Sequence, residues 1–574
     1  MSKRNIMGFA ACVAVCALAA EAKTVRVDAF AAADAQDDTA AFKAAINSGA
    51  DEVVVPARDR PWIVRPVSGR SNLTLRFEKG AVVEAKKGAF KGTGECMFRF
   101  NCCTNVTVSG YGATLRMHKW DYRAAPYKRS EWRHGLSFLS CVDVKVEGLT
   151  IIETGGDGIY LGVSANDPEK TNFRVTIRDV VCERNNRQGI SVISAEDLLI
   201  ENCDLNDTYG TSPEAGIDFE PNYPGQRFVN CRMRKCRMRN NMGSGMEFWI
   251  TRFDGTTRPV SILVEDCETE SNNEEIRFRD ASRNFGAKRT RSQGTVTIRN
   301  CTFRNMRNEY IYAAHETCRS ITLRIEGCTF IDDPLPERLA ASTVRKYIDD
   351  APGEMRPVPP MMLTGWIDYA VCVDRARPVA LKVKMSKASA VPTRKGKPLK
   401  GVEIATGLDV TDAAGAVVGR FDLLPLDVAG ETVWRINLPS AGVYTFGGFA
   451  NRGVVVLEAD APLAIDATWR GHTFGKAEGT LYAYVPEGAD RLVATVGGKS
   501  RQERVSASLF DPTGALRGSR TWVESCERYT FRNPKEGMWR FELGKPSVGS
   551  FTGYSFDVAG ALGYLFFDAK RCWR

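Results

Sequence analysis

The sequence predicts an all-β protein, in which a right-handed, single-stranded parallel β-helix is followed by two small C-terminal β-sandwich domains. Two observations predict the β-helix. Segments with alternating apolar and polar residues recur at intervals of 23 to 34 residues, and alternation with period 2 is typical of strands. A repeat of this length is typical of coils that stack on one another. Aligned on one small apolar position, the segments end at Leu149, Val180, Cys203, Cys236, Cys267, Cys301 and Cys328.

The cysteines of the repeat are predicted to be buried core residues. One cysteine per repeat lacks the paired spacing of a zinc site. The chain has 17 cysteines, of which Cys12 and Cys16 lie in an N-terminal leader, so the remaining number is odd and complete pairing into disulfides is excluded. We therefore expect thiols that point inward and stack along the axis of the coil.

Asparagine pairs mark the bends between the strands of several repeats. The pairs are Asn185-Asn186, Asn240-Asn241 and Asn272-Asn273. Asparagine tolerates the left-handed backbone that a sharp bend requires. We therefore expect these residues to turn the chain from one sheet of the coil to the next.

Residues 1–22 have the pattern of a secretory signal peptide. Lys3 and Arg4 provide positive charge, residues 8–19 are mostly apolar, and Ala20-Glu21-Ala22 is a small-residue cleavage site. The apolar stretch is shorter than the ~18 residues that a transmembrane helix needs, and no later segment reaches that length. We expect an exported protein that is secreted, periplasmic or held at the cell surface, without a transmembrane segment.

The residues after the leader predict a helical cap and resemble a known family. Asp37-Asp38-Thr39 opens an amphipathic helix with Asp or Thr as its N-cap, and such a helix would cover the unpaired edge of the coil. The motifs VVVP, SNLTLRFEKGAVVEA and NVTVSGYGATL follow at residues 53–56, 71–85 and 105–115. Together they resemble the opening of polygalacturonase-type β-helices in the pectin-lyase-like superfamily, over about residues 28–335. The resemblance implies a β-helix that acts on a polysaccharide.

The paired Asp-Asp, Gly-His-Gly and Arg-x-Lys signatures of polygalacturonases are absent from the matching repeats. Gly156-Asp157-Gly158 retains one acid, and Gln188-Gly189 stands in the next repeat. The resemblance therefore implies glycan chemistry without specifying the reaction.

The rest of the chain divides into three further parts. The prolines of residues 336–375 predict a linker after the β-helix of residues 23–335. Alternating strands between Gly and Pro turns then predict one β-sandwich at residues 376–468 and a second at residues 469–574. The second sandwich resembles accessory modules of exported hydrolases, with either a carbohydrate-binding or a structural role.

A second strand in each repeat follows the bend and carries the candidate functional residues. Its predicted inward positions are Ile159, Ile190, Ile217, Met246, Ile276 and Ile311. Because side chains alternate along a strand, the predicted outward ladder is Tyr160, Ser191, Asp218, Glu247, Arg277 and Tyr312, with Glu220, Trp249 and Arg279 two residues further on. An earlier segment places His134 in line with Asp157 and Gln188.

Stacked coils lie ~4.8 Å apart, so Asp218, Glu220 and Glu247 are predicted to be close neighbours. Their repulsion is costly unless Arg277, Arg279 or a metal ion offsets it, and crowding separates their pKa values as an acid/base pair requires. The cluster is either a salt-bridged ladder that stabilises an exposed sheet or a functional site. The aromatic residues of the two ladders favour a functional site, because aromatic faces stack against sugar rings.

Two reaction classes fit this cluster. A glycoside hydrolase, our first expectation, uses two carboxyl groups, and Asp157 is a candidate beside the acidic trio. A polysaccharide lyase would use Arg277 or Arg279 against a uronate, with Ca²⁺ held by the trio; otherwise we expect no cofactor and no metal. The substrate-binding candidates are His134, Tyr160, Gln188, Trp249, Arg277, Arg279 and Tyr312.

A non-catalytic glycan-binding or adhesin-like β-helix is a third hypothesis, because a fold alone specifies no activity. The net charge of +9 suits an acidic polysaccharide without requiring one. The leader and the lack of zinc-finger and RNA-binding motifs argue against a nucleic-acid partner. We expect a monomer.

Overall fold

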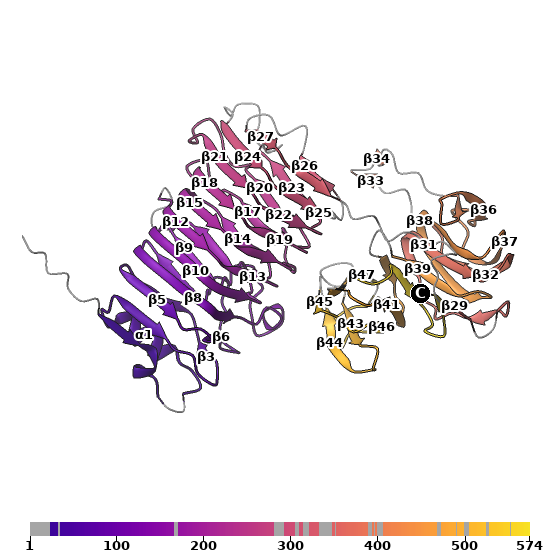
Figure 1. Ribbon diagram of the computed structural model, residues 1–574, viewed down its shortest axis with the longest axis horizontal. Helices are drawn as coiled ribbons and strands as arrows, with labels where there is room; N and C mark the ends of the chain where they lie inside the picture. The colour runs from indigo at the N-terminus through magenta and orange to yellow at the C-terminus, as the bar shows by residue number, and fades with distance from the viewer. Residues whose placement is uncertain are drawn as a thin grey trace, which may run out of the picture.

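The computed structural model shows a β-helix in the N-terminal part of the chain and antiparallel sheets in the C-terminal part (Figure 1). The signal peptide predicted at residues 1–22 lies outside the described residues. No helix of the described part is both long and apolar enough to cross a membrane. The described residues are 23–32, 35–165, 170–280, 292–304, 309–313, 321–331, 347–349, 352–388, 393–394, 397–398, 406–467, 472–489, 491–498, 504–523, 527–551 and 553–573.

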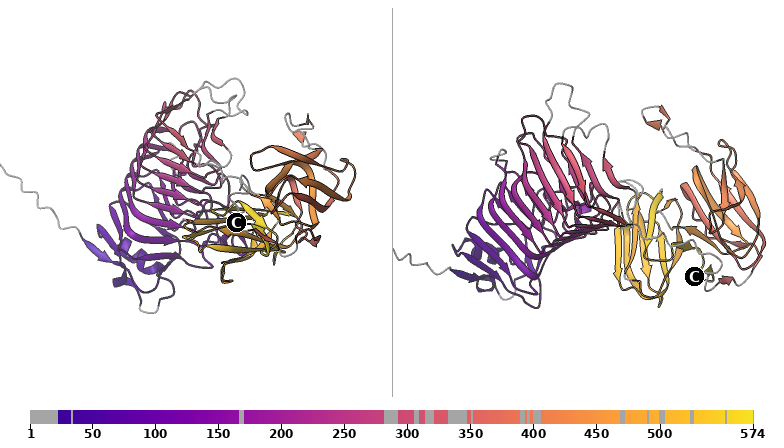
Figure 2. Two further views of the ribbon diagram at one scale, coloured as in Figure 1. Left: turned by 45° about the vertical axis from the view of Figure 1, so that its right-hand side comes forward. Right: turned by 45° about the horizontal axis from the view of Figure 1, so that its top comes forward.

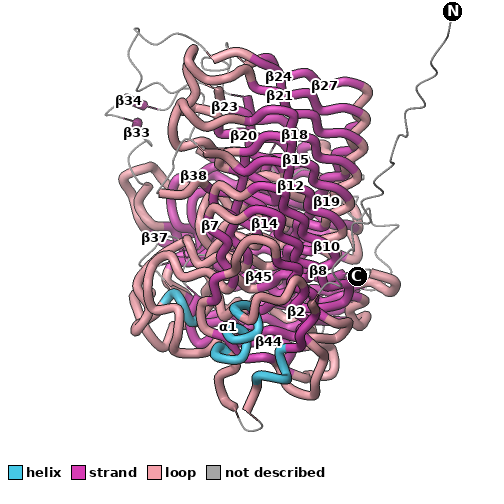
Figure 3. Tube along the Cα trace, turned by 90° about the vertical axis from the view of Figure 1, so that its left-hand side faces the viewer, coloured by secondary structure: helices cyan, strands magenta, loops and turns pink. Residues whose placement is uncertain are grey.

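One face of the β-helix is a parallel sheet of nine described strands, in which each strand pairs with the equivalent strand of the next coil. Figure 3 shows these coils stacked on one another. We call this face the nine-stranded sheet. Its strands are β4 (Val67–Ser68), β7 (Phe98–Asn101), β9 (Leu136–Leu139), β11 (Ile159–Gly162), β14 (Gln188–Val192), β17 (Ala215–Phe219), β20 (Met246–Trp249), β23 (Glu274–Arg279) and β26 (Glu309–Ala313).

The remaining strands of the coils form a parallel assembly of 19 described strands. Two coils cross it with long strands, β8 (Thr104–Arg116) and β10 (Val142–Ile152), and later coils cross it with two short strands each. The other members are β1 (Thr24–Arg26), β2 (Glu52–Val55), β3 (Trp62–Val64), β5 (Leu73–Phe77), β6 (Val82–Ala85), β12 (Asn172–Arg178), β13 (Val181–Glu183), β15 (Ala195–Glu201), β16 (Asp204–Asn206), β18 (Phe228–Arg234), β19 (Arg237–Arg239), β21 (Val260–Glu265), β22 (Glu268–Glu270), β24 (Gly294–Arg299), β25 (Thr302–Arg304), β27 (Thr322–Glu326) and β28 (Thr329–Ile331).

The helix α1 (Thr39–Asn47) covers the N-terminal end of the coil, as predicted. Its buried Phe42 packs against Trp62, with ring centroids 5.8 Å apart. Asp38 stands at the N-cap, but its carboxylate makes no bond to the helix. It accepts instead from the Ile63 N–H at 2.8 Å and from two arginines. The predicted N-cap is therefore correct in position. Its side chain bonds to the first coil and makes no capping hydrogen bond to the helix.

The predicted cysteine ladder is confirmed. Cys203, Cys236, Cys267 and Cys301 are free thiols that are at most 2% exposed, and Cys328 is half-buried. The Cys203 N–H donates to the Cys236 Sγ at 3.4 Å, and the Cys236 N–H donates to the Cys267 Sγ at 3.4 Å. A thiol is small enough to stack at the ~4.8 Å spacing of the coils.

Larger groups stack beneath the nine-stranded sheet. The Phe219 and Phe248 rings lie face to face on neighbouring coils, with centroids 5.4 Å apart and planes 10° apart. At the start of strands β9, β11, β14, β17 and β20, or directly before them, a glycine allows close contact between coils: a Cβ on Gly189 would lie 2.5 Å from the Gly216 carbonyl oxygen. The glycines of this row are Gly135, Gly158, Gly189, Gly216 and Gly245.

The asparagines at the bends differ in role from the prediction. Asn240 has a left-handed backbone, with φ 61°, but at the other two bends the left-handed residues are Arg184 and Ser271, directly before the asparagine pair. Asn241 and Asn272 are buried and join coils, since the Asn241 N–H donates to the Asn272 Oδ1 at 2.9 Å. An amide side chain both donates and accepts, so it satisfies backbone groups that a buried bend leaves unpaired.

The C-terminal part consists of antiparallel strands: 17 described strands share one system, and β29 with β49 and β33 with β34 form two separate pairs. The linker prediction was too long: β31 (Leu363–Val373) pairs with β38 (Gly442–Ala459). The proline cluster ends at Pro360, and the apolar alternation after it favours a strand. The boundary predicted at residue 468 lies outside the described residues.

The other strands of this part also pair with antiparallel neighbours. They are β29 (Tyr347–Asp349), β30 (Arg356–Pro357), β32 (Arg377–Met385), β33 (Thr393–Arg394), β34 (Lys397–Pro398), β35 (Gly407–Thr411), β36 (Val417–Asp422), β37 (Gly430–Leu438), β39 (Leu463–Asp466), β40 (His472–Gly475), β41 (Gly479–Val485), β42 (Arg491–Gly498), β43 (Val505–Phe510), β44 (Leu516–Val523), β45 (Glu527–Arg532), β46 (Gly537–Gly544), β47 (Gly553–Ala559), β48 (Tyr564–Phe566) and β49 (Arg571–Trp573).

The last sandwich, β41 to β48, contacts the β-helix, and Figure 2 shows the two side by side. The buried Arg528 on β45 places its Nη1 3.8 Å from the Asp207 Oδ1 in the coil. The Arg520 guanidinium on β44 lies 5.6 Å from the ring centre of Trp120. The junction is therefore built from cations of the sandwich against acidic and aromatic groups of the β-helix.

Gly189→Ala is expected to lower the free energy of unfolding by about 1–3 kcal/mol. The new Cβ would lie 2.5 Å from the Gly216 carbonyl oxygen and 3.1 Å from the Leu205 side chain, which forces two coils apart. Urea unfolding followed by circular dichroism measures the effect. Gly225→Ala is the matched control, because nothing lies within 4 Å of a Cβ there. Equal stability of the two variants would contradict this account of the glycine row.

Candidate functional site

The outward ladder that the sequence predicted is present on the nine-stranded sheet. Strand pairing joins, in this order, Tyr160, Ser191, Asp218, Glu247, Arg277 and Tyr312. The row is more buried than a solvated sheet face, because Ser191 and Asp218 are 0% exposed and Glu247 is 3% exposed. Charges that are nearly closed to water need partners within the protein or from a ligand.

Glu247 on β20 has a carboxyl group that titrates near neutral pH. Burial raises its pKa to about 7; Arg277 opposes the rise, and Glu220 and Glu274 add to it. Its Oε2 lies 3.9 Å from the Arg277 Nη1 and makes no hydrogen bond within the described part of the chain. Glu247 is therefore partly protonated at neutral pH, and one of its buried oxygens is unsatisfied.

Asp218 lies on β17, next to Glu247 on β20, and is wholly buried. Burial raises the pKa of its carboxyl group well above the usual range, Glu220 and Glu247 raise it further, and Arg187 opposes them. The Gln188 Nε2 donates to its Oδ2, whereas its Oδ1 has no hydrogen-bond partner among the residues that the structure describes. Asp218 is thus favoured in its protonated form and does not face the solvent.

Arg187 supplies the positive charge within the acidic cluster. It is 9% exposed, and it donates from Nη2 to the Glu220 Oε2 and from Nη1 to the Gln188 Oε1, both at 2.7 Å. The Glu220 side chain is 32% exposed, compared with 3% for Glu247. Glu220 is therefore the solvent-facing carboxylate of the cluster, and Arg187 is its ion-pair partner.

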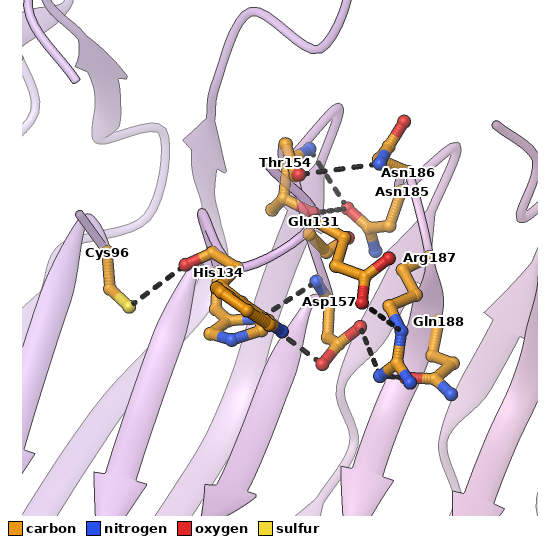
Figure 4. A network of polar contacts seen from close by, with 12 residues as sticks. Cys96, Glu131, His134, Thr154, Asp157, Asn185, Asn186, Arg187 and Gln188 are labelled. Carbon is orange, nitrogen blue, oxygen red and sulfur yellow. Dashed lines mark hydrogen bonds and ion pairs between the residues drawn. The ribbon is translucent and has the colours of Figure 1, made fainter. Parts of the chain in front are cut away.

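His134 and Asp157 lie next to this cluster and point toward one another (Figure 4). The Asp157 N–H donates to the His134 Nδ1 at 3.0 Å. The Asp157 Oδ2 lies 3.2 Å from the same nitrogen, and its Oδ1 lies 3.9 Å from the Arg187 Nη1. The His134 ring stacks on Tyr160 with centroids 4.4 Å apart. His134 and Asp157 are 2% and 0% exposed, so neither faces the solvent.

Arg277, expected to offset the acidic trio, does so at Glu247, whose Oε2 lies 3.9 Å from its Nη1, and it also binds Glu274. Its Nη2 donates to the Glu274 Oε1 at 3.0 Å, and its guanidinium lies 5.3 Å from the ring centre of Tyr312. Arg279 lies in the same way 4.5 Å from the ring centre of Trp249. Arg187 lies among Asp157, Asp218 and Glu220, whereas Arg277 lies between Glu247 and Glu274 and beside the Tyr312 ring.

Sequence reasoning missed Arg187 and Glu274. Both stand where a bend meets a strand, and period-2 alternation does not fix the direction of a side chain there. A search for the countercharge that three stacked carboxylates require could have found Arg187, because it directly precedes Gln188 in the repeat before the trio.

No three His, Cys, Asp or Glu side chains of the described residues are grouped in a way that could hold a metal ion.

A family model described as the right-handed β-helix region matches residues 127–253 and 170–335. Two curated proteins of Bacillus subtilis (strain 168) are similar in sequence. The uncharacterized protein YclG is 26% identical over 178 residues, which are 29% of this chain and 29% of YclG. The SPbeta prophage-derived uncharacterized protein YorA is 26% identical over 159 residues, which are 26% of this chain and 27% of YorA. The alignments thus span less than a third of either relative.

Three solved structures are also similar. The family 28 exopolygalacturonase of Yersinia enterocolitica has 14% identity and a TM-score of 0.41, and the match covers 54% of this chain and 66% of that one. An iota-carrageenase complexed to iota-carrageenan fragments has 12% identity and a TM-score of 0.40, with 54% and 91% covered. The tailspike protein gp49 of Acinetobacter baumannii bacteriophage Fri1, a capsular polysaccharide depolymerase, has 10% identity and a TM-score of 0.36, with 77% and 87% covered.

Likenesses of this degree carry no information about the reaction. The family match concerns the part of the chain that the structure folds into stacked parallel coils. Residues 127–335 thus match a right-handed β-helix region, and the parallel β-helix that the sequence predicted is confirmed.

Proposed function

We propose that the protein is an exported glycoside hydrolase that acts on a polysaccharide, with Glu247 as its acid and Glu220 as the partner carboxylate. The observation that carries the proposal is the different environment of these two neighbouring carboxyl groups. Glu247 is buried with a pKa of about 7, whereas Glu220 is partly exposed and paired with Arg187. A glycosidase needs one carboxylic acid and one carboxylate of this kind.

In the proposed reaction, Glu247 donates its proton to the glycosidic oxygen as the bond from that oxygen to the anomeric carbon breaks. Glu220 either attacks the anomeric carbon or takes a proton from the attacking water. Asp218 is a positioning residue. It holds the Gln188 amide, and the other end of that amide accepts from Arg187, which in turn holds Glu220.

The contacts disfavour a purely structural salt-bridge ladder. The Arg277 guanidinium lies 3.9 Å from the Glu247 Oε2, as in such a ladder, but it donates a hydrogen bond to Glu274 and none to that oxygen. Three buried side-chain oxygens, on Glu247, Asp218 and Ser191, have no hydrogen-bond partner within the described residues. Each unsatisfied group of this kind costs free energy, and all three lie on adjacent strands. This grouping favours a site that a ligand completes.

The remaining parts of the proposal rest on different observations. Export rests on the signal-peptide pattern of residues 1–22. A chain-like substrate is favoured because the nine-stranded sheet presents several aligned coils, with the partly exposed Trp249 and Tyr312 beside the carboxylates.

Glu247→Gln is expected to lower kcat by about 10²–10⁴-fold, because an amide cannot donate the required proton. The purified protein is screened against neutral and uronic-acid glycans, and new reducing ends are measured. Glu326→Gln, which changes an exposed glutamate on β27, is the matched control and keeps full activity. A product absorbing near ~235 nm would identify elimination by a lyase, and binding without any product would identify an adhesin; both results contradict the proposal.

The rate is expected to fall as the pH rises through about 7, because only protonated Glu247 can act as the acid. The profile of kcat against pH measures this. Arg277→Gln is expected to move the alkaline limb to higher pH, since Arg277 opposes protonation of Glu247. An unchanged limb in that variant would show that a different group sets it.

Glu247→Gln is also expected to stabilise the fold above neutral pH. The folded carboxyl group keeps its proton up to about pH 7, whereas its ordinary pKa is 4.5. Stability therefore falls by roughly 3 kcal/mol as the pH rises through this window, and glutamine avoids that loss. Urea unfolding at about pH 8 should show the variant to be more stable, with the difference vanishing below about pH 4. A less stable variant at the higher pH would indicate a structural ion pair.

A further inference from the structure

We infer that the last sandwich positions Arg187 within the candidate active site, through a loop of the β-helix that it holds in place. We call this loop, residues 117–135 between β8 and β9, the bridging loop. It contains the short helix η2 (Asp121–Arg123). The inference rests on the proposed function and adds positioning residues to it. It assigns to the sandwich the structural one of the two roles that its sequence allows.

The sandwich contacts the first part of the bridging loop. The Arg520 guanidinium on β44 lies 5.6 Å from the ring centre of Trp120, and the Arg123 guanidinium lies 4.6 Å from the same ring centre. Guanidinium groups at such distances are attracted to an indole ring. Glu527 on β45 is 4% exposed, and burial raises its pKa, while Arg520, Lys119 and Arg123 oppose the rise. The Glu527 carboxylate is therefore attracted to two cations of the bridging loop.

The sandwich and the bridging loop also hold one bend of the β-helix between them. From the sandwich, the buried Arg528 places its Nη1 3.8 Å from the Asp207 Oδ1. From the loop, the Lys119 Nζ donates to the Tyr209 carbonyl oxygen at 3.1 Å. The Tyr209 N–H donates in turn to the Asn185 carbonyl oxygen at 3.2 Å. The contacts of the junction thus extend to the bend that carries Arg187.

Both ends of the bridging loop contact this bend. Near its start, the Arg123 Nη2 donates to the Oδ1 of Asn186, which is 4% exposed and directly precedes Arg187, at 3.0 Å. Near its end, Glu131 places its Oε1 4.0 Å from the Arg187 Nε (Figure 4). The bridging loop therefore acts on Arg187 from two sides, through the preceding residue and through its charge.

The end of the bridging loop is itself fixed to the β-helix. Arg133 is 0% exposed, and its Nε donates to the Phe90 carbonyl oxygen at 2.7 Å. The Glu131 backbone packs on the next coil, because a Cβ on Gly156 would lie 2.5 Å from the Glu131 carbonyl oxygen. Glu131 is thus held beside Arg187 by packed and hydrogen-bonded groups, which can carry coupling between distant sites.

The position of Arg187 matters because its contacts lie on several sides. It donates to Glu220 at 2.7 Å and lies 3.9 Å from Asp157. Its buried Nε has no hydrogen-bond partner among the residues that the structure describes. The guanidinium is therefore placed by the bend at Asn186 and by the surrounding charges. A small displacement of the bend would change its distance to every carboxyl group of the cluster.

Two uncharged substitutions in the full chain test the inference. Trp120→Ala removes the ring that contacts both Arg520 and Arg123, and Asn186→Leu removes the acceptor of the Arg123 hydrogen bond. Either change is expected to let Arg187 shift away from the carboxyl groups. The kcat on a glycan that the wild-type protein cleaves should then fall about 10- to 100-fold. The pH midpoint of the Glu247 titration should rise by about 0.5–1 unit, because burial raises the pKa of Glu247 and a displaced Arg187 opposes that rise less.

Infrared difference spectroscopy measures this midpoint without a substrate. The spectrum of the same variant carrying Glu247→Gln is subtracted, which removes the contribution of Glu527. Tyr111→Ala, which removes a side chain that is 56% exposed on β8, is the matched control and keeps the wild-type rate and midpoint. Trp120→Phe retains a ring beside Arg123 and should behave like the wild type. Circular dichroism establishes that each protein is folded, and Trp120→Leu replaces Trp120→Ala if that variant is not.

The outcomes separate this inference from the proposed function. An unchanged or lowered midpoint in the folded Trp120 and Asn186 variants would overturn the inference even where kcat falls, because a loss of stability alone does not move the titration of Glu247 in a folded protein. A raised midpoint in a protein that cleaves no glycan would refute the hydrolase and leave the positioning role. Cleavage at the wild-type rate by both variants, with an unchanged midpoint, would do the reverse.

Discussion

The ~4.8 Å spacing of stacked parallel strands is the constraint on which the rest of this structure depends. It places every side chain of one coil against the equivalent side chain of the next. Thiols and phenyl rings make favourable contacts in this arrangement, as the ladder at Cys236 and the stack of Phe219 on Phe248 show. Carboxyl groups repel one another when they are stacked and buried. Burial and the neighbouring carboxyl groups therefore raise the pKa values of Asp218 and Glu247. The scaffold thus holds together groups that would separate in water.

Arg187 offsets part of the repulsion among these carboxyl groups. It lies between acids on three sides, at 2.7 Å from Glu220, 3.9 Å from Asp157 and, through Gln188, in contact with Asp218. Arg187 lowers the pKa values of Asp218 and Glu247, but burial outweighs it and keeps both pKa values raised. Glu220 is partly exposed, and a difference of this kind between neighbouring carboxyl groups is what an acid and a carboxylate require of one protein at one pH.

Much of the fold and the position of the site could be predicted from the sequence, because both follow from period 2 and a regular repeat. The alternation and the repeat predicted, for example, that Asp218 pairs with Glu247 and that a row of cysteines points inward. The roles of individual groups could not be predicted where the chain leaves regular structure. Arg187 lies at a bend, and β31 follows a proline cluster, so neither the countercharge of the site nor the end of the linker could be derived from alternation alone.

The central claim is that a buried carboxyl group on the β-helix face carries a proton near neutral pH. Infrared difference spectroscopy between acidic and alkaline samples measures it directly, through the carbonyl stretch of protonated carboxyl groups. The account predicts a carbonyl band that disappears with a midpoint near pH 7 in the wild-type protein and is weaker in Glu247→Gln, where the buried Glu527, whose pKa is also raised to about 7, still contributes. A band that the substitution leaves unchanged, or a Glu247 carboxyl group already ionised at about pH 5, would contradict the account.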